Sequence, residues 1–140
     1  MDFFTITFGV IALIFVFFFL KMLGRGKGGV VKTRFTADFN VLDQRFATCR
    51  PEADYSIFKE GKPHKIEIEV ERLPLEPGDT LDVYINRQLL SKITVKRDLE
   101  AEFEHWSDDD VPFPQIKAGD VVDIVYQNKP VLSGVFQQRK

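Results

Sequence analysis

From Val31 onward, apolar and polar residues alternate along most of the chain, and this period of two restricts the fold more than any other feature. The alternation is clear in 31–40, 65–71 and 98–104. Successive side chains of a strand point to opposite faces, so the pattern predicts antiparallel strands with one buried face and one wet face. A helix needs apolar residues three and four apart, and no sustained run of that kind occurs here.

Turn sequences such as Glu60-Gly61-Lys62-Pro63 and Pro77-Gly78-Asp79 separate the alternating runs. The segment 41–52 has the least regular pattern, and we expect Phe46 to fill the core there from a loop. The predicted strands are approximately 31–40, 53–59, 64–72, 80–86, 88–96, 98–106, 121–127 and 131–137.

Two stretches about 41 residues apart read alike, GDTLDVYINRQLLSKITV (78–95) and GDVVDIVYQNKPVLSGVF (119–136). Matching Leu-Leu-Ser (89–91) with Val-Leu-Ser (131–133) places one extra residue in the second turn. Each copy predicts a β-hairpin that cannot bury its apolar face alone. We therefore predict an all-β domain over 33–140, in which a duplicated hairpin packs face to face. The alternation alone leaves both a small antiparallel β-sandwich and a partly open barrel as alternatives. The aligned core positions are Leu81 with Val122, Val83 with Ile124, and Ile85 with Tyr126.

The N-terminal segment contains an uncharged run, FFTITFGVIALIFVFFFL, from Phe3 to Leu20. Extended to Leu23, a helix of this length spans roughly 30 Å, the thickness of a bilayer's hydrocarbon core. No basic region precedes the run and no Ala-x-Ala site follows it, so a retained single-pass signal-anchor over 1–23 is favoured over a cleaved signal peptide. Thr5 and Gly9 form a small-x-x-x-small pair, which is compatible with a weak homo-oligomer.

Charge is divided sharply along the chain. A glycine-rich tether over 24–32 follows the anchor, and the basic residues around it have no acidic neighbours. Beyond Arg34 the chain contains fourteen Lys and Arg residues and twenty Asp and Glu residues, so this part is acidic. An acidic net charge argues against nucleic-acid binding. The positive-inside rule predicts the N-terminus outside and the β-domain in the cytoplasm. The residues expected to contact anionic lipid are Lys21, Arg25, Lys27, Lys32 and Arg34.

The stretch HWSDDD (105–110) is the most suggestive chemically. Alternation places Trp106 on the wet face with the glutamates that precede it, where an exposed ring could contact a partner or a sugar. Burial of the ring in the core or as a plug at the strand end is nevertheless favoured. The aspartates could serve a hard cation, although the spacing of a known calcium loop is absent. The candidate partner contacts are Trp106, Asp108, Asp109 and Asp110.

No other motif predicts chemistry. GRGKGG (24–29) matches a dinucleotide-binding pattern, but it does not lie between a strand and a helix. Cys49 is the single cysteine, which excludes an intramolecular disulfide. A catalytic cysteine needs a histidine as general base, and neither His64 nor His105 has a spacing from Cys49 that indicates this role. We predict no enzyme, no catalytic residue, no cofactor and no metal.

The C-terminal motif Pro114-x-x-x-x-Gly119-Asp120-x-Val122, followed by Leu-Ser-Gly-x-Phe (132–136), resembles the end of small bacterial β-domain proteins. The upstream stretch VERLPLEPGDTLDVYINR also resembles those proteins, so the resemblance covers roughly 53–137. It implies a bacterial all-β domain. The family's function is unknown, so no site residue is carried over.

Together these features predict a non-catalytic binding or scaffolding module anchored at the inner (plasma) membrane. Its acidic strand faces favour a basic protein partner. The alternative is an extracytoplasmic envelope domain that binds glycan or a cation through the Trp106–Asp110 loop. A small enzyme is the third hypothesis, with only Cys49 and the two histidines to support it. The acidic faces consist of Glu67, Glu69, Glu71, Glu100, Glu102 and Glu104.

Overall fold

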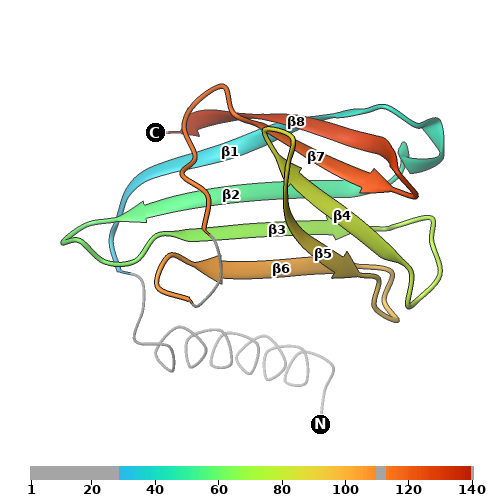
Figure 1. Ribbon diagram of the computed structural model, residues 1–140, viewed down its shortest axis with the longest axis horizontal. Coiled ribbons are helices and arrows are strands. Elements are labelled where there is room, and N and C mark those ends of the chain that lie inside the picture. The colour runs from blue at the N-terminus through green and yellow to red at the C-terminus, as the bar shows by residue number, and fades with distance from the viewer. Residues whose placement is uncertain (1–28, 110–112, 140) are drawn as a thin grey trace, which may run out of the picture.

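The computed structural model describes residues 29–109 and 113–139, and this part of the chain is all-β, as predicted. It contains eight strands and one short 3-10 helix (Figure 1). The elements are β1 Val31–Val41, η1 Gln44–Phe46, β2 Arg50–Phe58, β3 Lys65–Glu71, β4 Thr80–Ile85, β5 Gln88–Thr94, β6 Ala101–Trp106, β7 Val121–Tyr126 and β8 Lys129–Arg139.

All eight strands belong to a single antiparallel sheet, in the order β5-β4-β7-β8-β1-β2-β3-β6. The sheet curls on itself into a nearly closed barrel-like form (Figure 1), because twist accumulates from strand to strand. Its two end strands, β5 and β6, are not paired with each other within the described residues. Of the two architectures left open by the alternation, the partly open barrel is therefore correct and a sandwich of two separate sheets is not.

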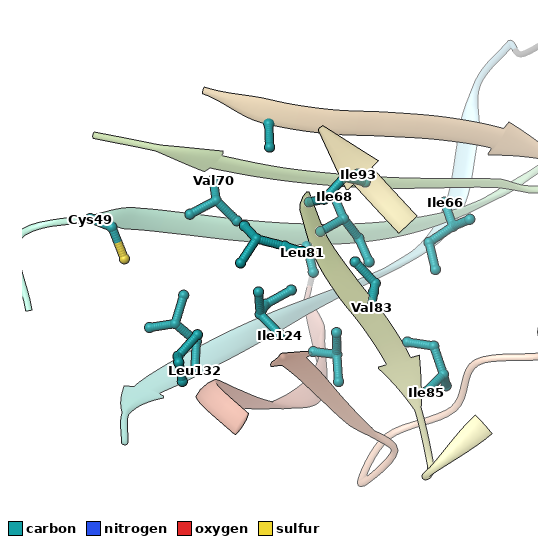
Figure 2. Packing of buried hydrophobic residues seen from close by; sticks show 14 of the residues in the cluster. Cys49, Ile66, Ile68, Val70, Leu81, Val83, Ile85, Ile93, Ile124 and Leu132 are labelled. Atoms are coloured by element: carbon teal, nitrogen blue, oxygen red, sulfur yellow. The ribbon is translucent and has the colours of Figure 1, made fainter. Parts of the chain in front are cut away.

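The core lies inside the curved sheet and is filled from both of its halves. Figure 2 shows Ile66, Ile68 and Val70 of β3 together with inward-pointing residues of β4 and β7. The loop prediction for Phe46 is confirmed: this residue ends η1, is 0 % exposed and lies 6.1 Å from the Tyr126 ring, centroid to centroid. Asp43 caps the short helix by accepting a hydrogen bond from the Arg45 backbone N–H.

The two similar sequence stretches form the hairpins β4–β5 and β7–β8, but they do not pack face to face. They lie side by side in the sheet, with β4 paired to β7. The pairing brings the equivalent residues Val83 and Ile124 opposite each other, so a local two-fold axis relates the hairpins there. The predicted packing was wrong because edge pairing satisfies the backbone of both hairpins at once.

The extra residue expected in the second turn is also absent. Asn86-Arg87 and Gln127-Asn128 are both two-residue turns with positive φ at each position, as in type I′ hairpins. Each hairpin instead has a register shift after Val83 or Ile124. The offset of 41 residues therefore runs through the whole repeat, and the Leu-Leu-Ser match is out of step by one residue.

The Gly-Asp dipeptide at the start of each copy has the same role in both. Gly78 and Gly119 have φ of 95° and 93°, a region that favours glycine. The Asp79 carboxylate accepts from the Glu76 N–H at 3.0 Å, and the Asp120 carboxylate accepts from the Lys117 N–H at 2.9 Å. Asp120 is buried, which makes its hydrogen bond the more costly one to remove.

Most predicted strand boundaries agree with the structure within a few residues. The main differences are that β2 begins at Arg50 and β6 begins at Ala101. The late start of β6 has a local cause, since Leu99 has a φ of 64° and the Lys96 N–H donates to the Glu100 carbonyl in a turn.

The predicted anchor (1–23) and residues 24–28 of the predicted tether (24–32), which hold all of GRGKGG but its last glycine, lie outside the described residues. Val31 and Lys32 already belong to β1. Across 29–109 and 113–139 there is no helix long and apolar enough to cross a bilayer.

Candidate functional site

The most distinctive surface is the outer face of the adjacent strands β2, β3 and β6, which we call the acidic face (Figure 1). Alternation on each strand sends the apolar residues inward and the carboxylates outward. The acidic face consists of Glu52, Asp54, Glu67, Glu69, Glu71, Glu100, Glu102 and Glu104.

The strand register places like charges directly opposite one another. One row crosses three strands through Glu52, Glu69 and Glu102. The neighbouring row contains Asp54 and Glu67, with Glu104 on β6. Like charges in directly opposed positions destabilise a sheet. Selection for stability alone would not favour two such rows of opposed carboxylates.

Basic residues compensate the margins of this face. Lys65 lies 2.9 Å from Glu67, and Lys96 lies 3.0 Å from Glu102. The hydrogen bond that Lys96 Nζ donates to Glu102 raises the pKa of Lys96, so this lysine stays charged. Arg34 holds Asp54 at 3.0 Å. Within the described residues, Glu52 and Glu69 of the first row have no ion pair.

At the end of the face where β3 ends, Glu69, Glu71 and Glu100 form a cluster whose nearest carboxylate oxygens all lie within 4.8 Å of one another. Desolvation first, then a hydrogen bond and charge repulsion from Glu71, raise the pKa of Glu69 to about 7. Desolvation, together with Asp98 and Glu71, also raises the pKa of Glu100. Near neutral pH the cluster therefore carries less than its full negative charge, and an approaching cation would displace a proton from it.

Carboxylate oxygens are the ligands of hard divalent cations, and this is the single cluster of its kind in the described residues. All three side chains are partly exposed, however, and calcium takes about six to eight oxygen ligands. The arrangement is better suited to the ammonium or guanidinium groups of a basic partner, which need no closed coordination shell.

Trp106 lies on the outer face that alternation predicts, but its ring is buried there at the end of β6, so the favoured expectation of burial is confirmed and the exposed contact is not. Its side chain is 5 % exposed and stacks on Phe58 with ring centroids 5.8 Å apart. The indole N–H donates to Glu104 at 2.7 Å, and Lys65 Nζ lies 5.4 Å from the ring centroid. Phe58 and Trp106 bury each other on the outer side of the sheet, so the ring is not presented for stacking on a sugar.

The aspartates after Trp106 are separated in role. The Asp109 carboxylate accepts from the Trp106 backbone N–H at 2.8 Å and closes the turn at the end of β6. Asp108 is exposed. Asp110, the last of these candidate contacts, lies outside the described residues.

The residues of the enzyme hypothesis do not come together. Cys49 precedes β2 at the end where Arg50 pairs with Glu71, whereas His64 precedes β3 at the other end. Cys49 is buried, and its pKa is raised by desolvation, which disfavours the thiolate. His64 Nδ1 instead lies 2.9 Å from the Tyr55 hydroxyl, and His105 Nδ1 is buried with no hydrogen-bond partner among the described residues.

Among the predicted lipid contacts, Lys32 and Arg34 are exposed on β1, and Arg34 is paired with Asp54. Lys21, Arg25 and Lys27 lie outside the described residues. Sequence reasoning identified six carboxylates of the acidic face but missed Glu52 and Asp54. Their alternation with Ala53 and Tyr55 was the available signal, and it was obscured because β2 was expected to begin only at Ala53.

Comparison with known proteins does not assign this site. No protein-family model matches the chain, and no curated protein matches it. The resemblance to small bacterial β-domain proteins therefore stays a prediction.

Proposed function

We propose that this chain is a single-pass membrane protein whose non-catalytic β-domain binds or scaffolds a basic protein partner at the inner membrane. The N-terminal apolar run holds the chain in the bilayer, with the N-terminus outside and the domain in the cytoplasm. The partner's Lys and Arg side chains bind the acidic face.

The observation that supports this proposal best is the cluster of Glu69, Glu71 and Glu100. These carboxylates have no ion pair within the described residues, although Lys65 and Lys96 pair with Glu67 and Glu102 on the same face. A complementary charged surface relieves this repulsion on binding, and it increases the association rate and specificity more than the raw affinity.

The two similar hairpins contribute to partner binding indirectly, by supporting the sheet that carries the acidic face. We infer that they are copies of one unit, because the turns, the register shifts and the Gly-Asp hydrogen bonds recur at an offset of 41 residues. They supply half of a rigid sheet, and a rigid sheet can hold like charges opposite one another without rearranging.

The first test is the side of the membrane on which the domain lies. Full-length protein with a C-terminal epitope is treated with protease in intact spheroplasts and in lysed ones. A cytoplasmic domain is degraded only after lysis, and degradation in sealed spheroplasts would contradict the proposed orientation. Recovery of the intact chain in the soluble fraction would contradict membrane anchoring itself.

The second test addresses the acidic face. A photo-crosslinking amino acid is placed at position 52 on this face, and in a matched protein at position 94, an exposed site on β5. We expect crosslinked products from position 52 alone. The combined substitution of Glu69, Glu71 and Glu100 by Gln should abolish them, whereas Gln at the exposed residues Glu60 and Glu76, off this face, should not. Equal crosslinking from both positions would contradict a partner surface on the acidic face.

A further inference from the structure

One end of the barrel gathers lysines where the described chain begins. The Lys59 N–H donates to the Val30 carbonyl at 2.9 Å, which holds the β2–β3 turn against the start of β1. A Cβ at Gly29 would lie 3.5 Å from Lys62 Cδ, so the Lys62 stem packs over the chain there. We call this surface the basic end, and it consists of Val30, Val31, Lys32, Lys59 and Lys62.

The basic end has the composition of a surface that contacts lipid headgroups. Its three lysines are exposed and form no ion pair in the described part of the chain. Val30 and Val31 are 66 % and 45 % exposed beside them. Glu60 is the single acidic residue in the β2–β3 turn. Lys59 and Lys62 were not among the lipid contacts predicted from sequence, because the turn that carries them is distant from the tether along the chain.

Chain length keeps this end close to the bilayer if the apolar run is the anchor. Six peptide units separate Leu23, the last residue of the predicted anchor, from Gly29. Even fully extended, they span only about 20 Å. The basic end is the part of the domain nearest this attachment point, so it is the part that meets the membrane surface first.

The opposite side of the same end of the barrel carries the acidic turn after β6, with Asp108 and Asp109. Strands β2 and β3 lie between β1 and β6, so three strand spacings, roughly 14 Å, separate Lys32 on β1 from the end of β6. Lys59 and Lys62 lie nearer to it, in the β2–β3 turn, where the His64 carbonyl accepts a hydrogen bond from the Ser107 N–H at 2.9 Å. The distance from Lys32 exceeds the Debye length of about 8 Å at physiological ionic strength. An anionic surface can therefore attract the side near β1 and repel the side near β6, which tilts the domain.

We propose that the folded domain docks on anionic lipid through the basic end, with Lys32, Lys59 and Lys62 at the headgroups and the end of β6 tilted away. This inference rests on the proposed membrane anchoring and adds an orientation to it. The acidic face extends along β2, β3 and β6 from the membrane-proximal end of the barrel toward the far end. In this orientation it stays accessible to a partner.

The test uses the full chain in vesicles that contain a headgroup-attached quencher. In a Cys49→Ala background, a fluorophore is attached through Glu60→Cys at the basic end or through Asp108→Cys at the end of β6. The two are matched, because each replaces one exposed carboxylate. In phosphatidylcholine vesicles containing phosphatidylglycerol, we expect quenching about twofold stronger at position 60 than at position 108, and the difference should vanish at high salt.

Replacing Lys59 and Lys62 by Gln should remove the difference, whereas Lys96→Gln at the far end of the barrel should leave it unchanged. Equal quenching at the two positions, or a difference that persists in vesicles of phosphatidylcholine alone, would overturn the docked orientation while leaving the anchoring intact. A chain that does not associate with vesicles at all would overturn the anchoring, and the docked orientation with it.

Discussion

The hairpins β4–β5 and β7–β8 and the strands β2, β3 and β6 belong to the same sheet, but they use polar side chains differently. In the hairpins, Asp79 and Asp120 bond to nearby backbone, and Asp82 lies 3.6 Å from Lys92 on the neighbouring strand. On the acidic face, Glu69 lies opposite two other carboxylates. Acidic residues thus support local structure in the repeated half. In the other half they form a charged surface on which the chain's own lysines and arginine pair with only some of the carboxylates.

The largest effect is expected from a core substitution in the repeated hairpins, and it tests whether their packing stabilises the barrel. Ile124 is fully buried at the local two-fold axis, opposite Val83. Ile124→Ala should lower the free energy of unfolding by about 3 kcal/mol, because it removes buried methyl groups and leaves a cavity. Urea denaturation followed by Trp106 fluorescence measures this. Val125→Ala, on the partly exposed outer side of the same strand, is the control and should cost less than about 1 kcal/mol.

The next effect compares the two copies directly. Asp120→Ala should cost about 2 kcal/mol and Asp79→Ala about 1 kcal/mol, because both lose a charge-assisted hydrogen bond to backbone but only Asp120 is buried. Thermal and urea unfolding of the two variants give the values. If neither substitution changes stability, the shared Gly-Asp hydrogen bonds do not stabilise the hairpins.

The contribution of Glu69 to folding stability should change with pH in the opposite direction from that of an ordinary ion-paired carboxylate. Because the folded pKa of Glu69 is raised to about 7, the native state binds more protons than the unfolded state from about pH 4.5 to 7. Stability should therefore fall as pH rises through this window. Glu69→Gln should stabilise the protein by about 1 kcal/mol at pH 8, after allowance for solvent screening, and by nothing near pH 4.

The matched control for that titration is Glu67→Gln. Glu67 has Lys65 at 2.9 Å, so its loss should be neutral or slightly destabilising at pH 8. A Glu69→Gln variant whose stability follows the wild-type pH profile would show that the cluster does not hold a proton.

The smallest effect is the response to salt. Screening weakens repulsion between exposed carboxylates, so raising the ionic strength from low to physiological should stabilise the wild type at pH 8 by about 0.5 kcal/mol. Glu69→Gln should be less sensitive, because one repelling charge has been removed. Equal salt responses in the two proteins, measured by thermal unfolding, would contradict the contrast between the two halves.

The sequence predicted much of this fold because alternation and turn residues are local signals. It anticipated the strands, the loop position of Phe46 and the outward direction of the carboxylates on β3. The exposed contact at Trp106, which was the less favoured interpretation, fails for a physical reason. Alternation assigns a side chain to a face of the sheet but not to a degree of exposure, and Phe58 at the end of β2 covers the indole. The hairpin packing was wrong for a related reason, since apolar pattern does not distinguish strands that pair by their edges from strands that stack.

What the sequence determined by itself is therefore the strand pattern, the repeat and the acidic composition, since each is set by residues close together in the chain. Only the tertiary structure decided which carboxylates face one another, because register between β2, β3 and β6 joins segments that are distant in sequence. The same holds for the basic end, where Lys59 is joined to Val30 by a backbone hydrogen bond and the Lys62 side chain lies over Gly29. These charged residues form a continuous surface only because the backbone hydrogen bonds of the sheet place their side chains side by side.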